Sequence, residues 1–139
     1  MKLLQTIPEF EPLKQAHKSG NFRRNDIKHS KVIVFYFWSR DCSLCKKWPQ
    51  FVDNLQHSYG NSVQCIVVHD GQIAPTEVPK VSGATSIIDE DKRLATSFNV
   101  RQYPAIYVFD TEQKLRFYQS GSSETRMLLR RIEKFIDPL

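Results

Sequence analysis

Hydrophobic residues along the chain gather in short continuous runs that alternate with stretches of helical spacing. Residues 32–38 form the longest run, which is rich in β-branched and aromatic side chains and predicts a central strand covered on both faces. From Ser43 to Tyr59 the apolar positions fall on one helical stripe, and Gly60 favours an end to that helix. Residues 63–68 are again apolar and predict the next strand.

The second half of the chain predicts further elements from weaker patterns. In order, we expect a loop over 71–84, a short strand over 86–88, a helix carrying Leu94, Ala95 and Phe98, a hairpin of strands 105–109 and 115–119, and a final helix burying Leu128, Ile132 and Phe135. Acidic residues 89–91 are expected to cap the first of these helices, and Ser122 or Ser123 the second.

The order of these elements predicts an α/β fold with a mixed sheet flanked by helices on both faces. A strand–helix–strand unit implies parallel strands joined by a right-handed crossover, and the late hairpin adds antiparallel strands. Residues 8–31 mix proline, glycine, histidine and charge, which predicts an extended arm with a turn at 19–21. We expect one domain spanning 1–139, with residues 1–31 as an arm packed on its core.

Composition narrows the class of protein further. Apolar residues make up 40% of the chain and aromatic residues 12%, which excludes a disordered protein. The net charge is +5, and residues 1–31 carry seven basic and three acidic side chains. Because no run of like charges occurs, we interpret this excess as a solvated surface and expect no nucleic-acid partner. The apolar stretches are too short for a signal-peptide core or a membrane span, so we expect a cytoplasmic protein without membrane contact.

The sequence Cys42-Ser43-Leu44-Cys45 follows the predicted central strand directly and lies where a helix is expected to begin. Unpaired backbone N–H groups and the positive end of a helix dipole favour a thiolate there, and the thiolate is the form that attacks disulfides. Arg40 and Lys46 add positive charge nearby. A Cys-x-x-Cys motif after a strand in an α/β pattern is typical of a redox-active dithiol.

A zinc site is the structural alternative for this cysteine pair. Zinc needs four ligands, but Cys65 lies alone in the strand predicted over 63–68. The histidines show no pairing at ligand spacing; they are His17, His29, His57 and His69. We therefore favour redox chemistry and expect neither a metal nor another cofactor, while Cys65 is interpreted as a small hydrophobic residue of the core.

These motifs resemble the thioredoxin superfamily over nearly the whole chain. The chain is most similar to the small TlpA/ResA-like thiol–disulfide oxidoreductases, particularly the soluble YkuV-type proteins of Gram-positive bacteria. The matching segments are Phe37-Trp38-Ser39 before Cys42–Lys46, the Tyr103-Pro104 step, Tyr107–Asp110 with the later Gly121, and the start Met1-Lys2-Leu3 with Ile7-Pro8-Glu9.

The resemblance implies a thioredoxin-like three-layer fold and assigns roles to individual residues. Cys42 would be the attacking cysteine and Cys45 the resolving one, and Lys46 beside them would support the thiolate. Tyr103 and Pro104 would form a loop with a cis peptide bond, which exposes backbone groups to an extended substrate. Trp38 would pack in the core and cover the dithiol. The partners implied are protein disulfides and an electron donor, and we expect a monomer.

Three positions depart from the family pattern. Tyr36 stands where thioredoxins carry a buried aspartate, so the usual proton acceptor for the second thiol is absent. Pro49 lies four residues after Cys45 instead of five. We expect a kink or a loosened turn beside Cys45, because the proline ring would clash with the Cys45 carbonyl inside a helix. Residues 71–84 are short and proline-rich, so we expect no helical insertion there.

His69 and Asp70 end the second predicted strand, at a sheet edge that should be shared with the dithiol. One of them would be able to replace the missing aspartate, although we favour the interpretation of a solvated strand end.

The leading function is the reduction of protein disulfides by the Cys42/Cys45 dithiol. A thiol peroxidase is an alternative, because Ser39 precedes Cys42 by three residues and Arg40 could stabilise an anion, but the neighbouring Cys45 argues against it. A non-catalytic module that binds peptides through the Pro104 loop is a further alternative.

Overall fold

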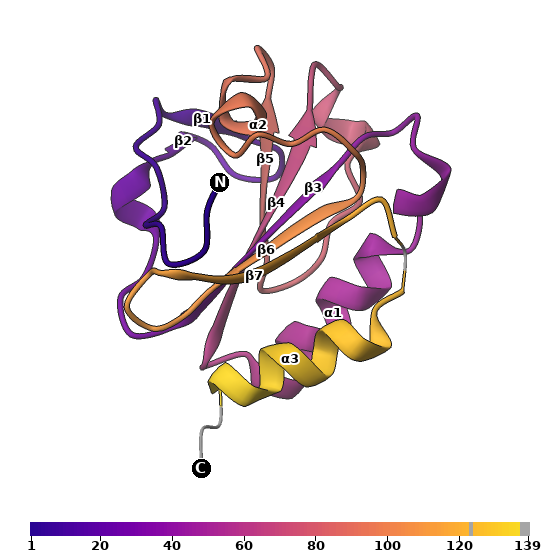
Figure 1. The fold of residues 1–139 in the computed structure, drawn as a ribbon. Helices are drawn as coiled ribbons and strands as arrows, with labels where there is room; N and C mark the ends of the chain where they lie inside the picture. The colour runs from indigo at the N-terminus through magenta and orange to yellow at the C-terminus, as the bar shows by residue number, and fades with distance from the viewer. Residues whose placement is uncertain (123, 137–139) are drawn as a thin grey trace.

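The computed structural model describes residues 1–122 and 124–136 of the chain (Figure 1). The strands and helices in chain order are β1 (Leu13–Gln15), β2 (Asn21–Phe22), β3 (Val32–Trp38), α1 (Trp48–Tyr59), β4 (Val63–Asp70), β5 (Thr85–Asp89), α2 (Arg93–Ser97), β6 (Ala105–Phe109), β7 (Leu115–Ser120) and α3 (Arg126–Ile136). Short 3-10 turns cover Arg24–Asp26, Ser43–Cys45 and Pro75–Glu77. No helix of the described part has both the length and the apolar character needed to cross a membrane.

The seven strands form one mixed sheet in the order β2-β1-β5-β4-β3-β6-β7. The central strand β3 pairs in parallel with β4 and antiparallel with β6. The β6–β7 hairpin is antiparallel. These pairings confirm the predicted α/β fold. They also place Trp38, the last residue of β3, directly opposite His69 at the same end of the sheet.

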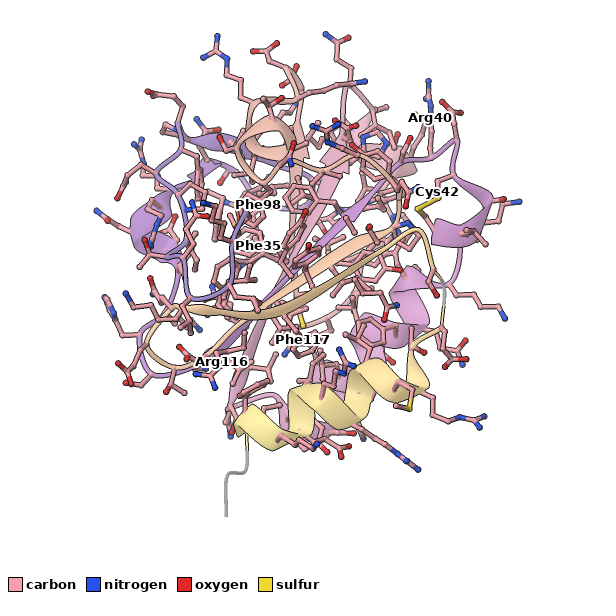
Figure 2. The ribbon with its side chains drawn as sticks, in the orientation of Figure 1. Phe35, Arg40, Cys42, Phe98, Arg116 and Phe117 are labelled. Carbon is pink, nitrogen blue, oxygen red and sulfur yellow. A yellow bond between two sulfur atoms is a disulfide. The ribbon has the colours of Figure 1, made fainter. Side chains whose placement is uncertain are left out.

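Alternating side chains divide the core into two layers. One cluster lies between the sheet and the helices α1 and α3, and it includes Tyr36, Trp38 and Cys45. The other lies beneath α2 and the N-terminal arm, where the rings of Phe35 and Phe98 are 4.9 Å apart (Figures 1 and 2). Each fully buried aromatic side chain stabilises the fold by roughly 1.5–3 kcal/mol relative to an exposed one. The sheet is therefore covered on both faces, as the continuous apolar run in β3 indicates.

The N-terminal arm contains more regular structure than its sequence predicts. The turn expected at 19–21 is present, and Gly20 there has a φ angle of 79°. On either side of it β1 and β2 pair as a hairpin, and β1 then joins the sheet through β5. The arm buries Ile7, Phe22 and Ile27 in the core. Three-residue strands are too short to produce an alternation that a sequence pattern can reveal.

The prediction that a helix begins at Ser43 is wrong. The chain forms a 3-10 turn over Ser43–Cys45, leaves helical geometry at Lys47, and begins α1 only at Trp48. Pro49 explains the difference, because it has no N–H to donate to the Cys45 carbonyl and suits the first turn of a helix. The expectation of a kink or loosened turn beside Cys45 is thus confirmed, since the chain interrupts helical geometry between the 3-10 turn and α1.

Two predictions about the remaining helices can also be compared with the structure. The loop over 71–84 is confirmed, and its only helical piece is the 3-10 turn at Pro75–Glu77. The helix α3 begins at Arg126. The backbone N–H of Arg126 donates to Oε1 of Glu124 at 2.7 Å, so Glu124 and not Ser122 accepts the first N–H of the helix. The other expected cap, Ser123, lies outside the described residues.

Candidate active site

The two cysteines of the motif are joined by a disulfide bond at one edge of the molecule (Figure 2). Cys45 is 1% exposed and belongs to the core cluster under α1, whereas Cys42 is only partly buried. Their Cα atoms are 5.4 Å apart, within the usual range for a disulfide. The first cysteine of the pair is thus partly exposed, whereas the second is shielded by the protein.

Two successive backbone turns hold the pair after β3 ends. The Cys42 N–H donates to the Ser39 carbonyl at 3.0 Å, and the Cys45 N–H donates to the Cys42 carbonyl at 3.2 Å. Because α1 begins at Trp48, Cys42 does not lie at the start of a long helix, and that part of the sequence interpretation is wrong. The full dipole of α1 therefore does not act at Cys42, since its effect is confined to the first turn.

The two cations near the dithiol differ in their surroundings. Arg40 pairs with Glu77 through Nη1 and Oε2 at 3.1 Å, and both side chains are about half exposed. That pair links the dithiol loop to the 71–84 loop, but exposed pairs contribute only about 0–1 kcal/mol. Lys46 is exposed and has no carboxylate partner within the described residues. Within the described residues, the charge of Arg40 is thus partly compensated by Glu77, whereas that of Lys46 is not.

The sheet brings Trp38, Tyr103 and Pro104 to one of its ends, because Phe37 of β3 pairs with Ala105 of β6. Trp38 is 6% exposed, and its ring lies 5.4 Å from the ring of Trp48 within the same cluster as Cys45. Tyr103 is partly buried and packs against both core clusters, so it reaches from the dithiol side to the face that holds Asp70. The Tyr103–Pro104 peptide bond is cis and Pro104 is buried.

His69 and Asp70 do not form a solvated strand end, so that interpretation is wrong. His69 is 2% exposed, its Nε2 accepts the backbone N–H of Arg40 at 3.2 Å, and its Nδ1 lies 2.9 Å from the Gly71 carbonyl oxygen. The Asp70 carboxylate accepts the hydroxyl of Tyr103. Burial, followed by the bond to Asp70, raises the pKa of Tyr103 above its ordinary value. Each residue therefore supports a different loop of the site.

The alternation of β4 places these two side chains on opposite faces of the sheet. Cys65 and Val67 belong to the cluster that contains Cys45, so His69 shares their face. Asp70 points to the opposite face, where Lys92 Nζ lies 4.0 Å from its carboxylate. Asp70 is consequently separated by the sheet from the layer that holds the dithiol.

Tyr36 occupies the position at which the sequence departs from the buried aspartate of the thioredoxin pattern. It is 3% exposed, and its ring packs 5.8 Å from that of Phe51. Burial raises the pKa of Tyr36 to about 12, so its phenol is neutral at physiological pH. The side chain therefore cannot accept a proton from Cys45 as a carboxylate would.

Cys65 is 1% exposed in β4, and burial raises the pKa of its thiol well above the ordinary value. The interpretation of Cys65 as a core residue is confirmed. Within residues 1–122 and 124–136, no group of three or more His, Cys, Asp or Glu side chains is arranged to hold a metal ion.

Sequence reasoning missed the contributions of Glu77 and His69. No local signal connects Glu77 to Arg40, since they are 37 residues apart and meet only in the folded chain. His69 did carry a signal: it continues the inward positions 63, 65 and 67 of β4, and that alternation predicts burial.

Comparison with known proteins supports this description of the fold. Thiol-disulfide oxidoreductase YkuV of Bacillus subtilis (strain 168) is 29% identical over 145 residues, which cover 98% of this chain and 97% of that protein. The solution structure of a thioredoxin-like protein in the oxidised form matches with a TM-score of 0.81 at 27% identity, over 98% of this chain and 97% of the other. Fold and cysteine pair thus define a thioredoxin-like thiol–disulfide oxidoreductase.

A second solved structure and a family model extend the comparison. A Chlorobium tepidum protein assigned as the thiol:disulfide interchange protein DsbE shares the fold with a TM-score of 0.85 at 18% identity, over 99% of both chains. The family described as TraF, the F plasmid transfer operon protein, matches residues 15–130. The chain therefore belongs to the TraF family.

Proposed function

We propose that the reduced protein transfers electrons to disulfide bonds of other proteins, with Cys42 as the nucleophile and Cys45 as the resolving thiol. The observation that supports this assignment is the difference in exposure between the partly buried Cys42 and Cys45 at 1%. A protein substrate can approach only an accessible sulfur. A shielded second thiol close by suits the intramolecular step that follows.

The proposed reaction has two balanced exchange steps. The Cys42 thiolate attacks one sulfur of the substrate disulfide, which forms a mixed disulfide and releases the other substrate sulfur as a thiolate. Cys45 loses its proton and attacks the Cys42 sulfur of that mixed disulfide, which releases the second substrate thiolate and leaves the Cys42–Cys45 disulfide. Two electrons pass to the substrate, and an electron donor must then reduce the protein again.

The substrate segment is proposed to lie beside Tyr103 and Pro104. Among the described residues, the backbone N–H and C=O of Tyr103 have no hydrogen-bond partner. Such groups on the surface can pair with an extended peptide in the manner of an added strand. Leu44, 46% exposed between the cysteines, offers an apolar contact for the same segment.

Water is proposed as the acceptor of the Cys45 proton. Tyr36 is a neutral phenol, because burial raises its pKa to about 12. Asp70 faces the other side of the sheet, where Tyr103 and Lys92 surround it. Neither side chain is suited to take the place of the missing aspartate.

The direction of electron flow is proposed to be reduction, with the cytoplasm as the compartment. A glutathione pool there keeps most exposed dithiols reduced, so the protein would start each cycle with two thiols. The protein is proposed to act as a monomer.

The experiment that tests this function mixes the reduced protein, freed of reductant, with a disulfide-bonded protein such as insulin. We expect one Cys42–Cys45 disulfide to form for every substrate disulfide reduced, as counted by alkylation and mass spectrometry. A protein that fails to exchange, or that consumes hydrogen peroxide faster than it reduces insulin, would contradict the proposal and favour the thiol peroxidase.

A further inference from the structure

His69 is a buried polar side chain beside the dithiol to which the proposed reaction gives no role. It lies at the end of β4, and the edge of the Trp38 ring system packs against it with 4.7 Å between the ring centres. The side chain is 2% exposed. Both ring nitrogens of a buried imidazole need hydrogen-bond partners. The partners of His69 therefore show which loops the side chain connects.

The partners of the ring fix its protonation. Nδ1 faces the carbonyl oxygen of Gly71 at 2.9 Å, and a carbonyl can only accept, so Nδ1 carries the hydrogen. Nε2 faces the backbone N–H of Arg40 at 3.2 Å, so it offers its lone pair. Both bonds are made at once only by the neutral ring with its hydrogen on Nδ1. His69 therefore acts as an acceptor toward the dithiol loop.

The bond to Arg40 is made within the turn that carries the nucleophile. The Cys42 N–H closes that turn on the Ser39 carbonyl at 3.0 Å, and Arg40 is the second residue of the turn. The other contact of Arg40 is its side-chain pair with Glu77, which is half exposed and weak. Among the described contacts of Arg40, the bond to His69 is the one that fixes its backbone to the sheet.

We propose that His69 is a positioning residue of the dithiol: by accepting the Arg40 N–H, it fixes the Ser39–Cys42 turn and holds the Cys42 sulfur near Cys45. This inference rests on the proposed function and deepens it. A turn fixed in advance loses less freedom when the two thiols join, so the protein disulfide forms more readily.

The consequence can be measured in the exchange with glutathione. Reduced protein and one oxidised glutathione molecule give the protein disulfide and two reduced glutathione molecules, with two electrons passing from the Cys42/Cys45 thiols to glutathione. The equilibrium constant of this reaction increases with the effective concentration of the Cys42 thiol relative to the Cys45 thiol, that is, with how closely the protein holds the two sulfurs together. Loss of the anchor at Arg40 should lower that constant.

Two amide substitutions at position 69 separate the two hydrogen bonds. The side-chain oxygen of His69→Gln reaches the place of Nε2 and can still accept the Arg40 N–H. The shorter side chain of His69→Asn places its amide near Nδ1, where it can donate to Gly71 but does not reach Arg40. Both variants lose the ring contact with Trp38 and both keep an uncharged amide, while Asn is one methylene shorter than Gln. The exposed His57→Gln serves as a control.

The test measures the glutathione equilibrium constant of each protein after acid quenching and alkylation. We expect His69→Asn to lower the constant about tenfold, the effect of one lost hydrogen bond, and His69→Gln and His57→Gln to stay within about twofold of the parent protein. Equal constants for His69→Asn and His69→Gln would overturn the inference. A parent protein that fails to equilibrate with glutathione would instead contradict the proposed function. If His69→Asn does not fold, a tenfold decrease in His69→Gln would overturn the inference by itself.

Discussion

The hydroxyl of Tyr103 donates a hydrogen bond to the carboxylate of Asp70 and so connects the loop before Pro104 to the end of β4. The other carboxylate oxygen of Asp70, Oδ1, is buried and has no hydrogen-bond partner among the described residues. Lys92 lies 4.0 Å away but is largely exposed, so water screens its attraction. Tyr103 is consequently the main group that stabilises a largely buried charge.

Removing the Tyr103 hydroxyl should therefore destabilise the protein. We expect Tyr103→Phe to lower the free energy of unfolding by about 1–3 kcal/mol, because the Asp70 carboxylate loses its hydrogen bond while it stays buried. Urea unfolding measures the effect. Tyr118→Phe is the matched control, since Tyr118 is 52% exposed and should cost within about 0.5 kcal/mol. A Tyr103→Phe variant as stable as Tyr118→Phe would contradict this account.

The second prediction concerns the proton of Cys45. If water accepts it, Tyr36→Phe and Asp70→Asn should each leave the pH dependence of the resolving step unchanged. The rate at which Cys45 releases substrate from the mixed disulfide, followed by rapid quenching between pH 6 and 9, measures this. A pH dependence that disappears in one of the two variants would identify that side chain as the acceptor.

The third prediction concerns Cys65, which is buried and whose pKa is raised by burial. In the folded protein it should react with iodoacetamide far more slowly than Cys42, since thiols react as thiolates. Cys65→Ala should cost about 1–3 kcal/mol of stability through the cavity it leaves, and the rate of insulin reduction should be almost unchanged. A large loss of rate with intact folding would mean that Cys65 takes part in the reaction.

The fourth prediction concerns pH and Asp89, whose carboxylate accepts the N–H groups of Leu94 and Ala95 at the start of α2. Burial is the main cause that raises the pKa of Asp89 above 3.8, and the charge of Asp70 adds to it. The folded state then holds this proton more tightly than the unfolded state, so stability falls as pH rises through the raised value.

Replacing Asp89 tests whether its ionisation lowers the stability of the folded state. Asn keeps an oxygen that can accept an N–H of α2 but carries no charge, so the cost of Asp89→Asn should be smaller at pH 7 than at pH 4. Urea unfolding at the two pH values measures the difference, and the exposed Asp91→Asn is the control. A cost that grows from pH 4 to pH 7 would show that the ionised carboxylate is favoured in the folded state.

Parts of this structure follow from local sequence patterns. The continuous apolar run predicts both ends of β3 correctly. A strand buried on both faces is apolar at every position, so its first and last residues stand out in the sequence. The Cys-x-x-Cys motif directly after that strand likewise predicts the cysteine pair that the disulfide joins. By contrast, a helical stripe extending back to Ser43 hides the break at Lys47, since periodicity does not register the missing N–H of Pro49.

The supporting contacts of the site depend on the fold and cannot be predicted from local patterns. Arg40 meets Glu77 and the Nε2 of His69 only after β3 and β4 pair and the 71–84 loop closes over them. The sequence near a cysteine therefore does not reveal a carboxylate that pairs with a neighbouring cation, as Glu77 does with Arg40. The role of Tyr103 in satisfying Asp70 likewise joins two residues that are 33 positions apart in the sequence.

The central claim, that Cys42 attacks and Cys45 resolves, is tested most directly by trapping the mixed disulfide. Cys45→Ser and Cys42→Ser are each incubated with insulin, quenched with acid, and analysed by mass spectrometry. Cys45→Ser should accumulate a covalent complex through Cys42, because nothing remains to release the substrate, while Cys42→Ser should form none through its shielded thiol. Equal trapping by the two variants, or a complex only through Cys45, would contradict the account.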